Sequence, residues 1–444
     1  MAYQAQMQLL DKLLTASRSL WQVKAFESVA LPWEAGFPAL AACVWQINDD
    51  EIEAIDSDSQ RLLETLLPAL QQDLKQQDLQ QQDQQWPLEL LSQYTQPATT
   101  DDSEHEQDND IGLNANELPH FSAHIKGRKW QQIVAFAQRL KETSNKETAT
   151  KDTATNESAT KESANRGEVL EWCAGKGHLG RLLAKAQQRK VVSLEWQQAL
   201  CDAGDDFAKR WALSQRFICG DAFDLQVASL FKADQQVVAL HACGDLHIRM
   251  LRHATAAKTA CVALSPCCYH LIEDKHYQGL SSVAKGSELK LSRHDLQLPL
   301  QQSVIANDKA RELRLQEIAW RLGFDSLQRK VRGCDHYLPV PSIKQSQLSG
   351  SFRDFCLWAA AQKQLALPES WSAEDYLQQG LSRQRLTRRI DLVAHLFRDC
   401  LEQWLLLDRV CYLEEAGYQV ELSQFCPKHI TPRNGFILAN RKNG

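Results

Sequence analysis

The first hundred residues carry apolar side chains at the three- and four-residue spacing of amphipathic helices. The two clearest sets are Leu9, Leu10, Leu13 and Leu14, and Leu62, Leu63, Leu66 and Leu67. Residues at this spacing lie on one face of a helix, and a shared apolar face favours packing of one helix on another. The pattern predicts a helical N-terminal region over residues 1–115.

Polar segments interrupt this region and separate it from the rest of the chain. Residues 71–86 are rich in glutamine, and residues 100–110 are acidic and nearly free of apolar groups. We interpret both as solvated connectors. Residues 116–140 should hold a helix, centred on 130–140, that leads into the next domain. The imperfect Lys-Thr-Ser-Glu-Ala repeat at 141–166 has no apolar face, which indicates a low-complexity flexible linker.

From Glu168 onwards, short β-branched runs alternate with helical patterns. This alternation is typical of βαβ units on a parallel sheet, so residues 167–444 are predicted to form an α/β domain. The predicted strands are 169–172, 191–194, 217–219, 237–240 and 261–264. A helical pattern at Leu179, Leu182, Leu183 and Ala186 follows the first strand.

A long, mainly helical stretch at about 271–385 follows the fifth strand and is predicted to be an insertion that shapes substrate binding. Its tryptophans, Trp320, Trp358 and Trp371, are expected in a core rather than on a base-stacking surface. The chain ends with a predicted helix at 401–416, Gly417, and two short strands at 419–422 and 435–439.

The formal net charge of -6 argues against a protein that binds polyanions over its whole surface. Basic residues nevertheless gather in two places, where they either bind phosphates or form a solvated helix face. The first cluster is Lys126, Arg128 and Lys129, and the second is Arg383, Arg385, Arg388, Arg389 and Arg398.

The thirteen cysteines are odd in number and form no Cys-x-x-Cys pair. Several lie in apolar runs, as Cys219 and Cys261 do, so we expect reduced, buried thiols and no disulfide-linked partner. The N-terminus has no secretory pattern, and no apolar run approaches the roughly 18 to 20 residues that span a bilayer. We expect a soluble cytoplasmic protein that does not bind membranes.

Gly175 and Gly177 lie between the first predicted strand and its helix, where glycine permits a sharp turn and close approach of a ligand. Glu195 follows the second strand, where a carboxylate binds ribose hydroxyls, and Asp221 follows the third, where one can accept from an adenine amino group. The dinucleotide-binding motif Gly-x-Gly-x-x-Gly has a third glycine, and the segment His178-Leu179-Gly180 matches that part of the motif only loosely. An acidic Glu171 in the first turn suits the ammonium of S-adenosyl-L-methionine better, although a tight turn without a ligand remains the alternative.

Four segments carry a family resemblance: VLEWCAGKGHLGRLLA, ALHACGDLHIRMLRHA, VALSPCCYHLI and the C-terminal FRDCLEQWLLLDRVCYLEEAGYQVELSQFCPKHITPRNGFILA. They resemble the methyltransferase domain shared by eukaryotic methyltransferase-like proteins and the glutathione-S-transferase-C-terminal-domain-containing protein. A more distant similarity is to acceptor-stem tRNA 2′-O-methyltransferases. The resemblance covers about residues 120–300 and 385–444. It implies the seven-stranded Rossmann-like class I methyltransferase fold with an antiparallel last strand. Cys173 departs from the usual first glycine of the motif, and the family tolerates a small residue there.

The residues predicted to bind this cofactor are Glu171, Cys173, Ala174, Gly175, Gly177, Glu195, Asp221, Ala222 and His241. The segments 241–247 and 265–270 leave the fourth and fifth strands and should face the transferred methyl group, because ligands of open α/β sheets bind at the carboxyl ends of strands. The candidate catalytic residues in them are His241, Asp245, Cys267, Cys268 and His270.

Three interpretations of these two segments stay open. The cysteines are small packing residues, or the histidines and Asp245 position or deprotonate an acceptor, or cysteines and histidines bind a metal. A thiolate nucleophile belongs to the second interpretation and is not favoured. The metal is the weakest of the three and is not predicted, because the spacing matches no zinc ribbon or knuckle.

The sequence therefore predicts an S-adenosylmethionine-dependent methyltransferase with RNA as the leading acceptor class. The alternatives are a protein or small-molecule acceptor, or a cofactor-binding adaptor without turnover whose N-terminal helices bind a partner.

Overall fold

The computed structural model describes residues 2–78, 86–95, 113–114, 116–149, 167–301, 308–344 and 348–442. It divides into two compact units. The sheet unit comprises Met1–Gln8, Pro97–Leu300 and Glu402–Gly444, and the helical unit comprises Leu9–Gln96 and Gln301–Leu401. Each unit is therefore assembled from segments that lie far apart in the sequence.

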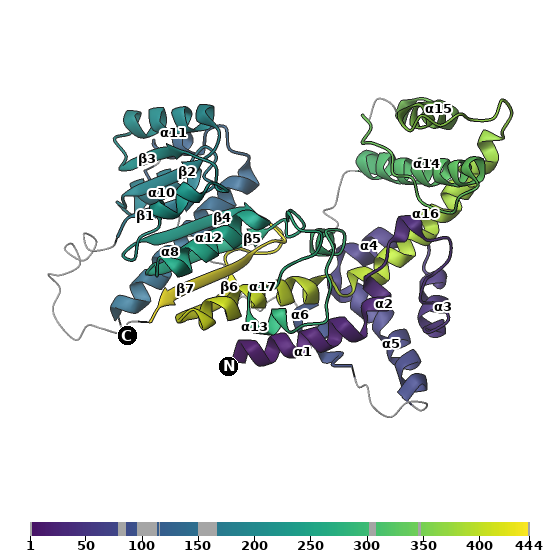
Figure 1. Ribbon diagram of the computed structural model, residues 1–444, viewed down its shortest axis with the longest axis horizontal. Coiled ribbons are helices and arrows are strands. Elements are labelled where there is room, and N and C mark those ends of the chain that lie inside the picture. Colours follow the sequence, from purple (N-terminus) through teal and green to yellow (C-terminus); the bar gives the residue numbers. More distant parts are fainter. Residues whose placement is uncertain are drawn as a thin grey trace. The chain divides into compact units, whose positions relative to one another are not determined.

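The sheet unit contains a seven-stranded sheet in the order β3-β2-β1-β4-β5-β7-β6 (Figure 1). Strands β1 to β5 pair in parallel, whereas β7 is antiparallel to both of its neighbours, β5 and β6. This confirms the predicted seven-stranded α/β fold with an antiparallel last strand. The strands are β1 (Val169–Trp172), β2 (Val191–Glu195), β3 (Gln215–Cys219), β4 (Gln236–Cys243), β5 (Cys261–Cys267), β6 (Tyr418–Gln424) and β7 (Gly435–Arg441).

Helices cover both faces of this sheet, and alternate residues of each strand face different helices. On β1, Leu170 and Trp172 belong to the core formed with α12 (Asp245–Ala256) and α17 (Arg398–Glu415). Val169 faces the core formed with α8 (Gly127–Ala149) and α10 (His178–Ala186). A strand buried on both faces is continuously apolar, which is why β1 and its neighbours could be recognised from sequence.

The remaining helices of the sheet unit are shorter or lie near the edge of the sheet. α11 contacts β3, and its Gly204 leaves no room for a Cβ beside the ring of Phe217. These elements are α7 (Leu118–Ser122), α11 (Gln198–Arg210), η3 (Leu225–Leu230), α13 (Ser282–Lys285) and η4 (Asp295–Leu300).

The helical unit has its own apolar core, in which α14 and α16 pack along each other and α15 packs on α14. Trp320 is buried there and Trp358 and Trp371 pack against the same core, so the prediction that they are core residues is confirmed. The elements are α2 (Arg18–Trp21), η1 (Ala25–Glu27), α3 (Pro38–Gln46), α4 (Ile52–Ser57), α5 (Ser59–Asp78), α6 (Glu89–Thr95), α14 (Asp308–Arg332), α15 (Phe352–Gln362) and α16 (Ala373–His395); α1 (Ala2–Ala16) begins in the sheet unit and ends in this one.

Helices α5 and α8 extend into segments that were predicted to be connectors. The first part of the glutamine-rich segment continues α5, and Leu74 is buried while the buried Asp73 carboxylate accepts the N–H groups of Ala39 and Leu40, both at 2.9 Å. These contacts hold the helix where composition suggested a connector. Likewise α8 continues to Ala149, past the predicted start of the linker. Residues 79–85, 100–110 and 150–166 lie outside the described residues.

The prediction for the second basic cluster was wrong for four of its arginines, which are largely buried in ion pairs, whereas Arg385 is exposed but also paired. Arg383 donates to Asp325 Oδ2 at 2.6 Å, Arg389 to Asp49 Oδ1 at 2.8 Å, and Arg398 to Asp56 Oδ1 at 3.0 Å. Arg385 and Arg388 also form ion pairs, with Asp49 and Glu53. Periodicity alone could not reveal these acidic partners, since Asp325 lies 58 residues from Arg383 and the other partners lie more than 300 residues away.

All thirteen cysteines lie in the described part of the chain, and none forms a disulfide. Cys219 is exposed rather than buried because it ends β3, the edge strand. Among the described residues, no helix combines the length and the apolar character needed to cross a membrane.

Candidate cofactor and catalytic site

The turn between β1 and α10 contains the glycines that the sequence singled out. Gly175 and Gly177 have φ angles of +58° and +64°, the left-handed region that glycine adopts without strain. A Cβ on Gly177 would lie 2.4 Å from the Phe217 ring, and one on Gly180 would lie 2.4 Å from Glu171 Oε2. Gly177 and Gly180 therefore let α10 pack directly on the sheet.

Glu171 is covered by this close packing. Its Oε1 accepts the Gly180 N–H at 3.0 Å, its Oε2 accepts the Ser193 hydroxyl at 2.6 Å, and the residue is 4% exposed. Burial raises its pKa to about 7, although these hydrogen bonds and Arg181 act in the opposite direction. Glu171 does not line the cavity described next, so its placement does not support the predicted contact with the cofactor ammonium.

A cavity of about 280 Å³ opens at the carboxyl ends of β1, β2 and β3. Glu195 lies at its wall, with Oε2 accepting the Gly175 N–H at 2.9 Å and Oε1 accepting the Gln197 N–H at 3.0 Å. A carboxylate offers about four lone-pair positions, so Glu195 retains acceptor capacity for a ligand. Asp221 lies beyond β3, where its Oδ1 accepts the Phe223 N–H at 2.9 Å.

Four of the predicted cofactor-binding residues line this cavity, namely Cys173, Glu195, Asp221 and Ala222. Glu171, Ala174, Gly175, Gly177 and His241 do not line it. Sequence reasoning missed five further lining residues: Leu194, Trp196, Gly220, Phe223 and Leu246. Trp196 is 69% exposed directly after the strand-ending Glu195, and such an exposed indole beside a strand end could have been noticed.

Leu246 reaches the cavity through the tertiary structure. The indole N–H of Trp172, at the end of β1, donates to the Leu246 carbonyl at 2.9 Å and so holds the first turn of α12 beside β1. Cys173, the next residue, has a φ of +54°. Burial, together with Glu195, Cys243 and Asp221, raises the pKa of Cys173 to about 12, so it presents a neutral thiol to the cavity.

His241 lies at a register irregularity in β4, between Leu240 and Ala242, and has a φ of +61°. Its Nε2 lies 2.8 Å from Gln132 Oε1 of α8. Burial and the nearby Arg433 and Lys129 lower its pKa to about 4. The imidazole is therefore neutral at physiological pH and has the charge state of a hydrogen-bond acceptor or general base.

Three thiols meet where β4 and β5 end. The Sγ atoms of Cys243, Cys267 and Cys268 all lie within 4.8 Å of one another, and that of Cys243 is 3.6 Å from that of Cys267. Contacts with the other two thiols lower the pKa of Cys268, whereas the same contacts and burial raise the pKa of Cys267. His270 acts electrostatically on Cys268, and its buried Nδ1 has no hydrogen-bond partner among the described residues.

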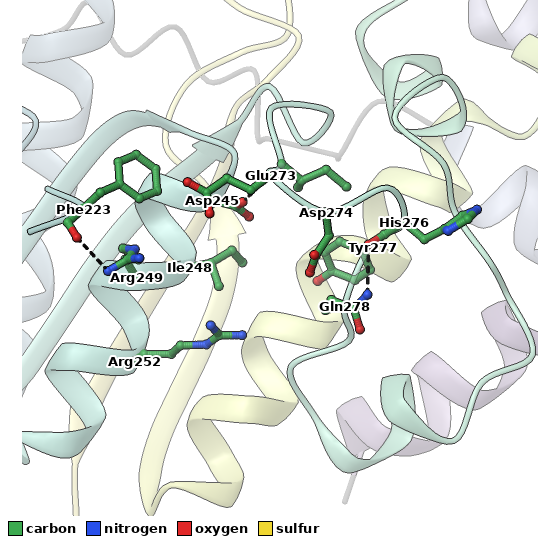
Figure 2. A pocket seen from close by; sticks show the side chains of 11 residues that line it. Phe223, Asp245, Ile248, Arg249, Arg252, Glu273, Asp274, His276, Tyr277 and Gln278 are labelled. Atoms are coloured by element: carbon green, nitrogen blue, oxygen red, sulfur yellow. Dashed lines mark hydrogen bonds between the residues drawn. The ribbon is translucent and has the colours of Figure 1, made fainter.

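Asp245 lies apart from these thiols. It begins α12, accepts the Glu273 N–H at 2.7 Å, and lines a second cavity of about 140 Å³ (Figure 2). Arg249, which also lines it, donates to the Phe223 carbonyl at 3.1 Å and stacks on the Phe223 ring. Phe223 borders both cavities. The structure thus brings Cys267 and Cys268 together and leaves Asp245 in a neighbouring polar cavity.

Three cations form what we call the basic rim, Lys129, Lys176 and Arg433. Burial, Arg181, Lys129 and Lys176 lower the pKa of His178 to about 3, and Arg433 and Lys129 add to the effect of burial on the pKa of His241. The two lysines are exposed and Arg433 is half-buried. Within the described residues, no ion pair is formed by these three side chains. Positive charge is therefore concentrated beside His178, which begins α10, and His241 of β4.

Comparison with known proteins gives this region a family. Residues 128–275 match the family model described as a methyltransferase domain. The matched segment contains β1 to β5, the cavity and the thiols of Cys243, Cys267 and Cys268. Residues 128–275 therefore carry a methyltransferase domain.

Solved structures give weaker similarities. An O-methyltransferase family protein from Burkholderia thailandensis is 9% identical with a TM-score of 0.26, over 74% of this chain and 63% of its own. An S-adenosylmethionine-dependent methyltransferase from Clostridium acetobutylicum is 11% identical with a TM-score of 0.22, over 34% and 56%. A putative sarcosine dimethylglycine methyltransferase from Galdieria sulphuraria is 11% identical with a TM-score of 0.20, over 24% and 42%. This chain thus covers about half of their lengths, and such scores carry no argument about its substrate.

Proposed function

We propose that this protein transfers a methyl group from S-adenosylmethionine to RNA in the cytoplasm. The cavity that combines Glu195, Asp221 and apolar walls at the carboxyl edge of the sheet carries the proposal for the cofactor. The basic rim beside that edge supports RNA as the acceptor. The sequence resemblance to acceptor-stem tRNA 2′-O-methyltransferases agrees with this choice, and thirteen unbridged cysteines agree with a reducing compartment.

The residues of the cavity suit an adenosyl group by their chemistry. The free lone pairs of Glu195 accept the two ribose hydroxyls, and Asp221 accepts from the adenine amino group. Leu194, Ala222 and Leu246 supply apolar walls for the base. When bound, S-adenosylmethionine supplies an electrophilic methyl group on a sulfonium ion.

The protein contributes positioning and a proton acceptor. Methyl transfer needs the acceptor atom in line with the methyl group at near-attack distance, and holding the two together can account for much of the rate enhancement. The neutral imidazole of His241 lies at the strand end next to the rim, where it can take the proton that an RNA hydroxyl or amino group loses. Gln132 fixes the ring through Nε2.

RNA is favoured over a neutral small molecule because the rim is positive and forms no ion pair within the part of the chain that the structure describes. The five arginines of the second cluster are all held in ion pairs, which leaves the first cluster, Lys126, Arg128 and Lys129, together with the rest of the rim for phosphate contacts. Phosphate neutralisation by such side chains makes binding strongly salt-dependent.

The cofactor proposal is tested by calorimetric titration of the full chain with S-adenosylmethionine. We expect wild-type protein to bind, and Asp221→Ala to bind at least ~10-fold more weakly, which corresponds to one lost hydrogen bond to a charged group. Asp224→Ala is the matched control, because Asp224 is an exposed carboxylate three residues away that does not line the cavity. Absence of binding to the wild type would overturn the proposal.

The acceptor is tested by incubating the protein with cofactor labelled in the methyl group and with fractionated cellular RNA, protein and metabolites. We expect label in RNA. Label in protein or metabolites would overturn RNA as the acceptor, and cofactor binding without label in any fraction would indicate an adaptor.

The rim is tested by replacing Lys129, Lys176 and Arg433 together with alanine. RNA binding should weaken and its salt slope should fall by about 2, since each single-strand phosphate contact contributes about 0.7. The control triple is Lys209, Arg210 and Lys258, three exposed cations in the last turn of α11 and just after α12, at the amino edge of the sheet. Equal losses in both triples would contradict a specific role of the rim.

A further inference from the structure

The thiols of Cys243, Cys267 and Cys268 gather where β4 and β5 end. β4 ends at Cys243 and β5 ends at Cys267, and these two residues are register partners on neighbouring parallel strands. All three Sγ atoms lie within 4.8 Å of one another. Leu246, which follows Cys243 by three positions, lines the cofactor cavity, and Cys243 also acts electrostatically on Cys173 of its lining.

Two irregularities of the backbone create this cluster. In β4, the register shifts between Leu240 and Ala242 and leaves His241 without a partner on β5. Because of this shift, Cys243 pairs with Cys267 and not with the residue that follows Cys267. A bulge of this kind re-aims the side chains that follow it. After β5, Cys268 adopts a φ of +48°. Adjacent residues of a regular strand point to opposite faces, and this turn brings the Cys268 thiol to the same side as that of Cys267.

A non-glycine residue in the left-handed region costs roughly 1–3 kcal/mol, and such residues gather at functional sites. His241 and Cys268 both adopt it, and both serve to assemble the cluster. Apolar packing of three cysteines does not require either irregularity. The backbone geometry therefore indicates that the thiols are brought together for a ligand.

The spacing of the sulfur atoms agrees with a zinc ion at the centre. Zinc–thiolate bonds are about 2.3 Å long and structural or catalytic zinc is tetrahedral, so two thiolate ligands lie about 3.8 Å apart. The Sγ atoms of Cys243 and Cys267 are 3.6 Å apart, well beyond the ~2.05 Å of a disulfide. Closing the cluster around a metal needs only small movements of the third thiol.

We propose that Cys243, Cys267 and Cys268 bind one Zn²⁺ ion and leave the fourth position to an exchangeable ligand beside His270. Soft thiolates favour zinc over the hard cations that oxygen ligands select. The buried Nδ1 of His270 lacks a partner among the described residues, and a ligand on the metal would provide one. Three thiolates around Zn²⁺ leave one net negative charge, and Arg433 acts electrostatically on both Cys243 and Cys268.

Three protein ligands with one open position are the arrangement of catalytic rather than structural zinc. The site goes beyond the proposed methyl transfer, because metal binding can be measured without cofactor or acceptor. Failure of the methyltransferase experiments would leave this inference standing, and the reverse also holds.

The test uses the full chain purified without chelator. Elemental analysis should find one zinc per chain, and replacement by Co²⁺ should give the strong visible absorption of tetrahedral cobalt with thiolate-to-metal charge-transfer bands. Cys267→Ser should weaken zinc binding by more than about 100-fold, beyond the loss typical of an outer-shell partner. The control Cys219→Ser removes an exposed thiol at the end of edge strand β3 and should bind like the wild type.

Cys268→Ala provides a second variant should Cys267→Ser fail to fold, as judged by circular dichroism. Cys268 is half-buried and tolerates truncation better than buried Cys267. Equal zinc stoichiometry and affinity in the folded variant and the wild type would overturn the proposal. Weak octahedral cobalt absorption in the wild type would also overturn it.

Discussion

The carboxyl group of Glu171 lies where its negative charge costs free energy. It is buried between β1 and α10, and its pKa rises to about 7 from an ordinary 4.5. Between these two values the folded state binds more protons than the unfolded state, so stability falls as the pH rises through this window. Below pH 4.5 the group is protonated in both states, and above pH 7 the full cost is present.

We therefore expect Glu171→Gln to be stabilised relative to the wild type as the pH rises from 4.5 to 7. At about 1.4 kcal/mol for each pKa unit, the difference in the free energy of unfolding between the variant and the wild type should grow by about 3 kcal/mol over this range. Urea unfolding at a series of pH values measures it. Subtracting the two curves removes the opposite effect of His178 and His241, whose lowered pKa values make stability fall as the pH drops below 6.5. Glu288→Gln, an exposed control, should follow the wild type, and parallel curves for Glu171→Gln would contradict the assignment.

At the scale of elements, α17 holds the chain that follows β5. Its buried Asp408 accepts the Tyr277 hydroxyl at 2.5 Å and the Leu280 and Ser281 N–H groups at 2.9 and 2.7 Å. The adjacent Arg409 donates to His247 Nε2 of α12 at 3.0 Å. This network ties the loop after Cys268 and the helix after Cys243 to one rigid element, and so fixes both segments that carry the candidate chemistry.

Asp408→Ala should destabilise the sheet unit by roughly 3 kcal/mol or more, because it leaves several buried donors unsatisfied. The matched control is Glu415→Ala on the same helix. Glu415 accepts the Ser282 N–H and hydroxyl at 2.9 and 2.6 Å in a similar way, but at the surface, where the loss should stay below about 1 kcal/mol. Urea unfolding followed by circular dichroism compares the two, and similar losses would refute the role of burial.

At the scale of the molecule, positive charge has two different uses. In the helical unit, Arg383 is buried and donates to Asp325 Oδ2 and to the Phe26 carbonyl, so this charge stabilises the packing of α16 on α14 and η1. In the sheet unit, the rim cations Lys129, Lys176 and Arg433 have no ion-pair partner among the described residues. Only the second set is available to a polyanion.

Arg383→Met should lower the stability of the helical unit by about 1.5–3 kcal/mol, as expected for the loss of a hydrogen bond to a charged group, because the buried Asp325 keeps its pair with Arg329. Arg385→Met removes a charge two residues away whose pair with Asp49 is 58% and 40% exposed, and should cost no more than ~1 kcal/mol. Urea unfolding measures stability, and cofactor and RNA titrations should be unchanged in both variants. A loss of RNA affinity in Arg383→Met at unchanged stability would assign this helix to binding instead.

The sequence alone determined the sheet, because continuous apolar runs such as 169–172 and 261–264 are buried on both faces and have no other stable location. It also located Glu195 and Asp221, since a strand-to-helix turn fixes where a strand-end carboxylate lies. Glu171 shows the limit of this reasoning. Its carboxylate was expected to contact the cofactor, but the close packing of α10, which its glycines allow, buries this carboxylate under the helix.

Contacts between distant segments were decided only by the tertiary structure. The acidic partners of the basic α16 lie in residues 49–56 and at 325, and no local periodicity records such pairing. The domain boundaries at 115, 140, 166 and 271–385 stay predictions, whereas the observed units join 9–96 with 301–401. The three-thiol cluster depends on a bulge and one left-handed residue, which shift register by a single position. A shift of one position leaves almost no trace in the sequence pattern, yet it determines which side chains contact one another.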